Sequence, residues 1–316
     1  MTYRSILAVL GVLAFATPTY ATSTSTDAKQ KHIGTVTQEQ TLLNLENITA
    51  ISGAAGNTFT QKMGNADVKQ INTGDIEAKQ VAAEKVNSDA KNGGLENYAS
   101  GNTSNMNKGN LDLIQKSTVE KVSAEQIVIE GHDGFTAKNT AANNQATLDE
   151  GNLWAKQISN AEKIKAKQRG SFARASELNN NVDGNVIYQR KGNSDVVQNN
   201  NGNHEGNQTY FSMNTAYASN TAAGNNFVNH SGNTDAKQKN VGDTLSNQYL
   251  RGFKNSSATN GSAGTTLTKL EGSLDAKQVN IGDVTADQRL ELVDGSSFSN
   301  TAAGTAMLQY KGNADI

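Results

Sequence analysis

The side chains of this sequence that could do acid–base or metal chemistry are four histidines and a set of recurring aspartates. His32, His132, His204 and His230 occupy unrelated positions in the repeat described below, so we expect solvated loop residues and not one convergent site. A recurring Gly-Asn-x-Asp pattern could suggest calcium, but it lacks the glycine density of calcium-binding β-rolls, and a lysine often follows the aspartate. Cleavage of a polysaccharide needs clustered acidic residues, and none is visible. We therefore expect no enzyme, no metal and no cofactor.

Hydrogen bonding between side-chain amides is indicated instead, because glutamines recur in register. Copies of one repeat start near residues 24, 64, 109, 151, 192, 232 and 272, with a clipped copy at 312. The first glutamine of each copy falls at Gln30, Gln70, Gln115, Gln157, Gln198, Gln238 and Gln278. The second glutamine falls at Gln40, Gln80, Gln126, Gln168, Gln208, Gln248 and Gln288. A period of 40 to 45 residues predicts stacked repeats.

Each repeat begins with a short strand and a turn. Within Leu274–Gln278, small or apolar residues alternate with Asp275 and Lys277, so one set points inward and the other outward. The pattern Asn-x-Gly-Asp follows and predicts a turn, because Asn and Gly tolerate left-handed backbone geometry. Its residues are Asn72, Asn240 and Asn280, with the turn glycines Gly74, Gly242 and Gly282. A second strand then ends on the second glutamine.

The second half of the repeat carries a marker of its own, Asn-Thr-Ala-Ala-Gly at residues 220–224 and 300–304, and a further strand follows it. We interpret each half, about 20 residues, as strand, turn, strand. One repeat then supplies four short strands. Two rungs per repeat give about fourteen rungs and a length of ~70 Å, whereas one broad rung per repeat gives ~35 Å. We favour two rungs, which separate Asp275 from its counterparts by one rung and so soften their repulsion.

The composition favours a stacked β structure over a conventional core. Only 35% of the residues are hydrophobic and 5% aromatic, which is little apolar material for a chain of 316 residues. There is no cysteine, and the one proline is Pro18, so backbone ladders can run uninterrupted without disulfides. Polar chains of this kind are either disordered or built on stacked amides, and a fixed register favours stacking. The expected fold class is an all-β β-solenoid.

The first residues predict export. Arg4 precedes an apolar run at 5–16, and small residues end at Ala21, which is typical of a signal peptide over residues 1–21. The run is too short for a membrane span, and no later stretch is apolar enough for one. The net charge of -2 provides no basic patch, so we do not expect nucleic-acid binding. Residues 22–316 are predicted to be one secreted repeat domain.

We expect the glutamines from Gln30 to Gln288 and the asparagines Asn72, Asn240 and Asn280 to form stacking ladders between rungs. Stacked amides satisfy groups whose burial without a partner would cost ~1–3 kcal/mol each. Charged residues on the outer face are expected to act as gatekeepers against premature aggregation. They are Asp67, Asp235, Asp275, Lys237 and Lys277.

The segments Gln189–Gln198 and Gln309–Ala314 resemble the curlin (curli-type) repeats of bacterial functional amyloid, which are strand-turn-strand units closed by glutamines. The similarity covers about residues 24–316, although Gly and Asn are adjacent here and Asp and Lys precede the glutamine. The Asn-Thr-Ala-Ala-Gly segments are weakly similar to Fap-type amyloid subunits. Either resemblance implies a secreted subunit that polymerises into β-rich fibres of a biofilm matrix.

The residues themselves point the same way, since no polar cap is evident at either end of the repeats and an uncapped stack offers its outer rungs to identical molecules. We expect a bacterial extracellular or cell-surface fibre made of copies of this chain. A nucleator and an outer-membrane secretion system are the other partners considered. The rival hypothesis is a monomeric β-solenoid adhesin or glycan-binding module that uses a lateral face.

Overall fold

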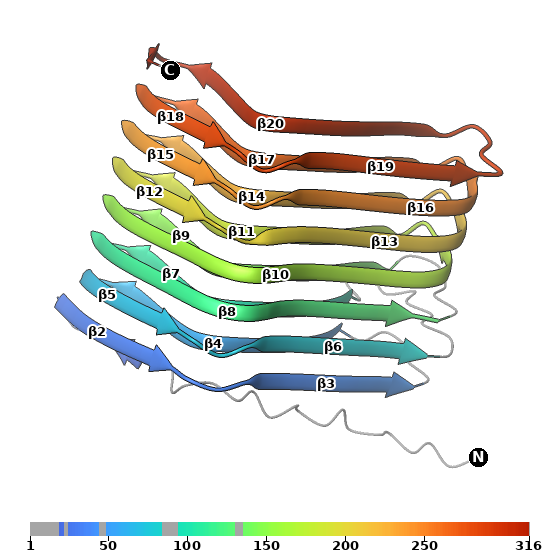
Figure 1. Cartoon of the computed structure of the whole chain (residues 1–316), viewed down its shortest axis with the longest axis horizontal. Helices are drawn as coiled ribbons and strands as arrows, with labels where there is room; N and C mark the ends of the chain where they lie inside the picture. The colour runs from blue at the N-terminus through green and yellow to red at the C-terminus, as the bar shows by residue number, and fades with distance from the viewer. Residues whose placement is uncertain (1–18, 22–24, 44–48, 84–93, 130–134, 316) are drawn as a thin grey trace.

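The computed structural model describes residues 19–21, 25–43, 49–83, 94–129 and 135–315, and its regular elements are all strands. They wind into a β-solenoid in which each coil lies on the previous one in parallel register (Figure 1). The short strand β1 (Thr19–Ala21) falls within the predicted signal peptide and pairs with β4. The prediction of one repeat domain after residue 21 stays a prediction.

Seven successive coils are described. The first coil comprises β2 (Ser25–His32), β3 (Val36–Leu43) and β4 (Thr49–Met63). The second comprises β5 (Asn65–Asn72), β6 (Ile76–Ala83) and β7 (Gly94–Lys108), and the third comprises β8 (Leu111–Val128) and β9 (Thr136–Glu150). The fourth coil comprises β10 (Leu153–Arg174) and β11 (Glu177–Lys191), and the fifth comprises β12 (Ser194–Asn200), β13 (Asn203–Asn214) and β14 (Tyr217–Ser231). The sixth coil comprises β15 (Thr234–Asn240), β16 (Thr244–Lys254) and β17 (Ser257–Glu271). The seventh comprises β18 (Leu274–Asn280), β19 (Val284–Glu291) and β20 (Ser297–Lys311), and β21 (Ala314–Asp315) then begins another coil.

Two parallel sheets face each other across the interior. The 8-stranded sheet takes the last strand of every coil, in the order β1-β4-β7-β9-β11-β14-β17-β20. The 13-stranded sheet holds the other strands and has two arms. The first arm comprises β2, β5, β12, β15, β18 and residues 111–117 and 153–159; the second comprises β3, β6, β13, β16, β19 and residues 121–128 and 163–174.

The predicted fold class is confirmed, but the preferred rung size is wrong. Gln198 pairs with Gln238, and Gln238 pairs with Gln278, so one complete coil uses the whole 40-residue repeat. Six spacings of about 4.8 Å therefore make a stack of about 30 Å, close to the shorter alternative. Asp235 lies directly under Asp275, with no rung between them to soften their repulsion.

The expectation of four strands per repeat fails in the second half. Residues 217–231 form one strand, β14, and the Ala-Ala-Gly segment inside it is a bend where the chain does not reverse. Ala222, Ala223, Gly224 and Asn225 are all buried, which interrupts the inward–outward alternation, and the pairing skips Gly224. This long bent strand spans both arms of the opposite sheet and fixes the coil at 40 residues.

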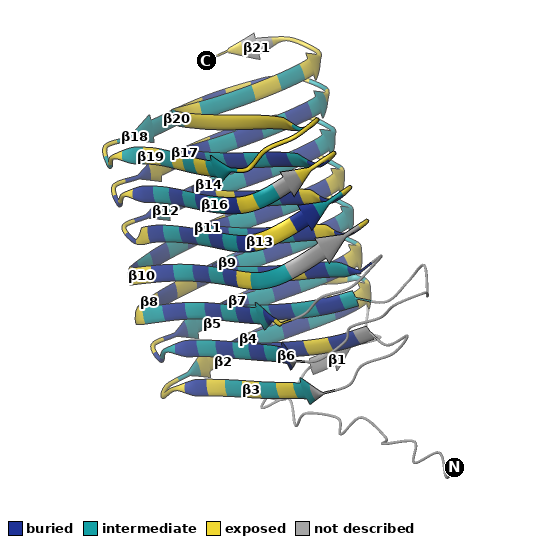
Figure 2. Ribbon diagram, turned by 90° about the vertical axis from the view of Figure 1, so that its right-hand side faces the viewer, coloured by how far each residue is buried: buried dark blue, intermediate teal, exposed yellow. Residues whose placement is uncertain are grey.

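The corner between one coil and the next depends on glycine. The repeat-opening glycines from Gly64 to Gly312 all have positive φ, between 104° and 138°, which side chains with a Cβ rarely adopt. The interior beside this corner is filled by apolar residues from each coil. Phe59, Leu113, Ile187 and Phe227 belong to one such buried cluster. Figure 2 shows buried and less buried residues alternating along the strands of the inner coils, whereas β20 is mainly exposed or intermediate.

Candidate functional site: amide ladders and charge columns

Two glutamine ladders run through the interior, one in each arm. In the first arm, the Nε2 of each glutamine donates to the Oε1 of the glutamine one coil earlier, from Gln70 to Gln278, at 2.7–2.9 Å. The second arm repeats this arrangement from Gln80 to Gln288, also at 2.7–2.9 Å. The fourteen glutamines noted in the sequence therefore lie in continuous hydrogen-bonded columns.

A second bond fixes the orientation of these amides. Gln157 Nε2 also donates to the carbonyl of Val186 in the opposite sheet, at 3.1 Å, and Gln238 Nε2 donates in the same way to Thr266 O at 3.0 Å. One N–H thus serves the ladder and the other serves the facing strand. Because both donors have partners, amides such as Gln157 can be fully buried without an unpaired group.

Two asparagine ladders in the 8-stranded sheet were not recognised from the sequence. One runs Asn57, Asn102, Asn144, Asn185 and Asn225; the other runs Asn97, Asn139, Asn180, Asn220, Asn260 and Asn300, with bonds of 2.7–2.9 Å. In both, Nδ2 donates to the coil that follows. The asparagine ladders therefore point in the direction opposite to the glutamine ladders.

The predicted asparagines lie at the corner between the two arms. Asn240 Nδ2 donates to Gly242 O at 2.6 Å and to Asn280 Oδ1 at 2.8 Å, and Asn200 extends this column by a bond of 2.6 Å to Asn240. Asn72 Nδ2 donates to Gly74 O at 3.0 Å and reaches Ser117 Oγ at 3.4 Å, where the column changes to serine.

The reason for the turn glycines differs from the predicted one. Gly74, Gly242 and Gly282 are absent from the set of residues with positive φ, so left-handed geometry does not require them. Close stacking requires them instead. A Cβ on Gly242 would lie 1.9 Å from Gly202 O of the previous coil, and a Cβ on Gly282 would lie 2.2 Å from Gly242 O.

Each corner asparagine fits against a bend glycine sixteen residues earlier. A Cβ on Gly224 would lie 2.3 Å from Asn240 Oδ1, so the asparagine occupies the volume that the glycine leaves empty. Where the glycine is replaced by Asn143, the corner residue is the smaller Ser159, and Asn143 Nδ2 donates to Ser159 Oγ at 2.8 Å. Gly101 faces the small Ser117, so the described corners never combine two large side chains, although they can combine two small ones.

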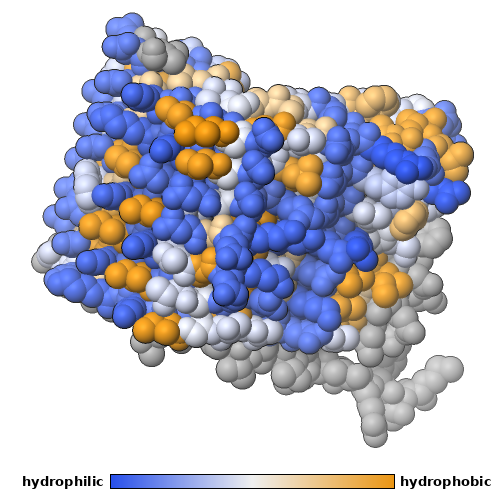
Figure 3. All heavy atoms as spheres, viewed as in Figure 1, coloured by the Kyte–Doolittle hydropathy of each residue, from blue (hydrophilic) through white to orange (hydrophobic). Residues whose placement is uncertain are grey.

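The outer face of the first arm carries columns of like charge. One column contains Asp27, Asp67, Asp112, Trp154, Asp195, Asp235, Asp275 and Asp315, paired coil to coil. In the neighbouring column, lysines are interrupted by two apolar residues, and a lysine pairs with an aspartate of its own strand, as in Lys237–Asp235 at 3.6 Å. The order of this column is Lys29, Lys69, Ile114, Lys156, Val197, Lys237 and Lys277. The predicted outer-face residues do lie outside, on a face that Figure 3 shows to be mainly hydrophilic.

The outer face of the second arm alternates its charges instead. Glu39, Lys79, Glu125 and Lys167 follow one another up one column, with ion pairs of 2.9 Å at Lys79–Glu39 and Lys167–Glu125. Glu205 accepts from Lys165 at 2.8 Å and contacts Lys163. Partial burial opposes ionisation of Glu205, but its bonds to Lys163, Lys165 and Asn207 outweigh this and lower its pKa to about 2.

Three of the four histidines contradict the expectation of solvated loop residues, and His204 does so most clearly. His204 lies in β13 and is 2% exposed, and neither ring nitrogen has a hydrogen-bond partner among the described residues. Burial lowers its pKa to about 4. His32 and His230 lie on strands at half-buried positions, and His132 lies outside the described residues. Alignment of the coils places His204 in register with Ile164 and Thr244. This register is the feature of the sequence that indicates burial of His204.

A lysine replaces an amide in one interior column. The side chain of Lys269 is buried, and its Nζ donates to Asn229 Oδ1 of the previous coil at 2.6 Å and to Gly232 O at 2.5 Å. Burial lowers the pKa of Lys269 to about 8, while Glu271 opposes that shift. A lysine can therefore take the donor role of a glutamine toward the coil beneath it.

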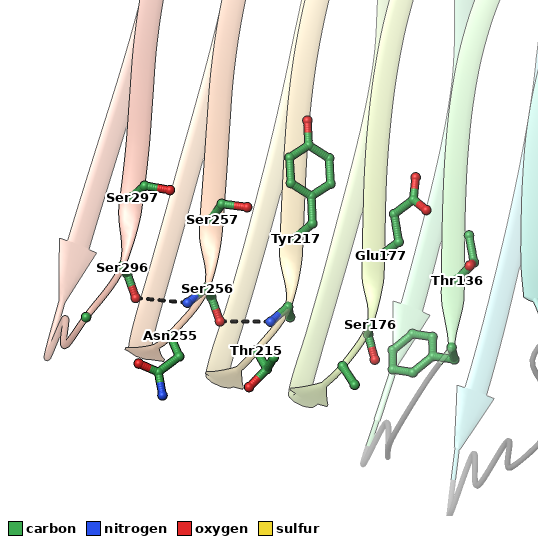
Figure 4. A pocket seen from close by; sticks show the side chains of 14 residues that line it. Thr136, Ser176, Glu177, Thr215, Tyr217, Asn255, Ser256, Ser257, Ser296 and Ser297 are labelled. Carbon is green, nitrogen blue, oxygen red and sulfur yellow. Dashed lines mark hydrogen bonds between the residues drawn. The ribbon is translucent and has the colours of Figure 1, made fainter.

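A groove of about 820 Å³ follows the corner where the second arm turns into the 8-stranded sheet. Figure 4 shows Ser176, Thr215, Asn255 and other polar side chains along it, from successive coils. Its serines support the backbone, since Ser256 Oγ accepts from Ala216 N at 2.9 Å and donates to Lys254 O at 2.7 Å.

Comparison of the chain with known protein families, with curated proteins and with solved structures found no match in any of the three. Within the described residues, no three or more His, Cys, Asp or Glu side chains gather where they could hold a metal ion. The described part of the chain also contains no helix of the length and apolar character that crosses a membrane.

Proposed function

We propose that this protein is a secreted structural subunit that assembles end to end into β-rich extracellular fibres. The observation that carries the proposal is the set of buried amide columns in register, because each coil hydrogen-bonds to a near copy of itself. A contact that repeats within one molecule suits repetition between molecules. The resemblance to curlin repeats supports the same function.

The last described coil gives further support. Phe298 aligns with interior residues such as Ala258 and Leu178, yet it is 59% exposed because no described strand covers it. Strands β19 and β20 have a partner on one side only. Unpaired strand edges with exposed apolar side chains favour addition of another strand layer. A second copy of the chain would supply that layer.

The outer charge columns fit a role in controlling assembly. Asp67, Asp235 and Asp275 lie in a column of stacked carboxylates, and stacked like charges oppose each new layer. Lys237 and Lys277 offset this repulsion within their own strands. We propose that these five residues slow association until the amide ladders are in register.

The test is incubation of the purified protein at neutral pH, followed by negative-stain microscopy and fibre diffraction. Unbranched fibres with a meridional reflection near ~4.7 Å are expected, and a persistent monomer would contradict the proposal. Gln278→Leu, which removes a ladder amide from the last coil, should slow growth about tenfold, since an unpaired buried amide costs ~1–3 kcal/mol. Val279→Thr on the outer face of the same strand is the matched control and should not slow growth.

A monomeric glycan-binding module is the second candidate, and the corner groove is the observation that favours it. Tyr217 is 39% exposed beside the groove, and the neighbouring Asn255 and Thr215 are exposed polar residues. Tyr and Asn side chains are common in sugar-binding surfaces because they combine ring stacking with hydrogen bonding. Retention of the monomer on immobilised polysaccharide, lost in Tyr217→Ala and kept in Tyr188→Ala, would favour this function over fibre assembly.

A further inference from the structure

The opposite directions of the ladders make the two ends of the stack different. In the glutamine ladders, each amide donates toward the first coil, so Gln278 Oε1 and Gln288 Oε1 are acceptors without a partner among the described residues. At the other end, Gln30 Nε2 uses one N–H on Thr58 O at 2.8 Å and keeps a second N–H. Gln40 accepts from Gln80 and likewise has no described acceptor for its own amide.

The asparagine columns of the 8-stranded sheet reverse this pattern. Asn57 Oδ1 in the first coil is buried and has no partner in the described structure, and the same is true of Ser52 Oγ, which lies under Asn97. At the opposite end, Asn300 donates one N–H to Ala286 O at 2.8 Å and keeps the other. Buried polar atoms without partners are uncommon and costly. Ser52 and Asn57 are each 1% exposed and β1 pairs with the same strand, so a second copy reaches them only once the predicted signal peptide at residues 1–21 is cleaved.

We propose that these ends are complementary interfaces, and that the first coil of a second copy of this chain docks on the last coil of the first copy. Glutamine N–H groups of Gln30 and Gln40 would meet Gln278 Oε1 and Gln288 Oε1. Asn300 and Thr305 would donate to Ser52 and Asn57. Docking of two like ends places donor against donor or acceptor against acceptor, so the fibre has one polarity. This proposal rests on the proposed function.

The contact already exists inside one molecule. Strand β2 contains Asp27–Gln30 with the sequence Asp-Ala-Lys-Gln, and β15 and β18 contain the same four residues. β15 pairs with β18 in register, with Asp235 on Asp275 and Gln238 on Gln278. β2 of a second copy would therefore meet, on Ala276–Asn280 of β18, the pairing that Ala236–Asn240 of β15 make. β21 covers only Leu274 and Asp275, which leaves Ala276–Asn280 open in the described structure.

Two substitutions disturb the junction while keeping the ladder bond inside each molecule. Gln30→Glu still accepts from Gln70 but places a carboxylate opposite the Oε1 of Gln278. Gln278→Lys still donates to Gln238, as Lys269 donates to Asn229, but places an ammonium opposite the N–H of Gln30. The double variant places the introduced carboxylate against the introduced ammonium at every head-to-tail junction, and these two charges attract each other.

The experiment measures elongation of sonicated wild-type seeds by each soluble variant, with circular dichroism as the control for folding. Each single variant should elongate at least about tenfold more slowly, the scale of one unpaired charged or buried polar contact. The double variant, grown on seeds of its own kind, should return to within about threefold of the wild type. If a variant does not fold, Gln40→Glu and Gln288→Lys form a second pair at the other ladder.

The outcomes separate the two proposals. If the wild type forms no fibres, the proposed function fails. If the wild type forms fibres but the double variant is slower than both single variants, like ends meet and the polarity is wrong. Single variants that elongate at the wild-type rate would also overturn this inference, because Gln30 and Gln278 would then lie outside the junction.

Discussion

The two arms of the 13-stranded sheet use the same interior glutamines but opposite rules on the outside. In the first arm, Asp lies on Asp in each described coil except the one that carries Trp154, and Lys237 lies on Lys277, so most neighbouring coils present like charges to each other. In the second arm, Glu39, Lys79, Glu125 and Lys167 alternate, so each coil prefers one particular neighbour. The first arm is suited to stacking on any copy, and the second arm fixes the order of coils within one molecule.

The largest expected difference between the arms is their response to acid. His204 has a pKa near 4 in the folded second arm and 6.5 when exposed, so the unfolded state takes up a proton first. Stability contributed by the neutral ring is present above pH 6.5 and is lost as the pH falls toward 4, by about 3 kcal/mol in all. His204→Val, which copies Val122 and Val284 of the same column, should remove this loss.

Urea unfolding at several pH values between 4 and 7 measures the effect. The control is His32→Asn in the first arm, which copies Asn72 of the next coil. This control should keep the acid sensitivity of the wild type, because it leaves the buried His204 in place. Equal acid sensitivity in His204→Val and the wild type would show that the second arm does not carry the difference.

A smaller effect is expected at the ion pairs. Glu205→Gln should lower the free energy of unfolding by ~1–2 kcal/mol at pH 7, because its carboxylate is 22% exposed and accepts from two lysines and Asn207. The folded pKa lies below 4.5, so this stability is present above pH 4.5 and is lost as the pH falls toward 2. Glu77→Gln, at the same column position with one lysine partner, should cost less than half as much in thermal melts.

The smallest expected effect is a change in stability whose sign differs between the outer faces of the two arms. Asp235→Lys should stabilise the fold by ~0.5–1 kcal/mol, since it places a cation between Asp195 and Asp275. Lys167→Glu should destabilise the fold by a similar amount, because it faces Glu125. Both changes should shrink in high salt. Melting temperatures that move in the same direction for both variants would mean that the two outer faces do not differ in their charge rule.

The sequence was sufficient to predict the solenoid and the glutamine columns, because Gln238 and Gln278 recur with identical neighbours. It did not reveal the coil length. An Ala-Ala-Gly segment is equally compatible with a reversal and with a bend, and only the opposite sheet shows that residues 217–231 continue as one strand. Once the coil is known to be one repeat long, the asparagine ladders can be read from recurrence at Asn139, Asn180 and Asn220. The burial of His204 was not predicted, because its position in the repeat was compared with the positions of the other histidines and not with that of Ile164.

The rule that bend and corner residues are never both large limits how the number of coils can change during evolution. Removal of residues 152–192, a single coil, would bring Asn143 against Asn200, two large side chains at a position where each described corner has at least one small residue. Removal of residues 110–192, two coils, would instead bring Gly101 against Asn200, which repeats the pairing of Gly184 with that residue. A loss of coils that leaves Asn143 opposite an asparagine should therefore be selected against, whereas a loss that leaves a glycine at the bend keeps the corner free of a clash.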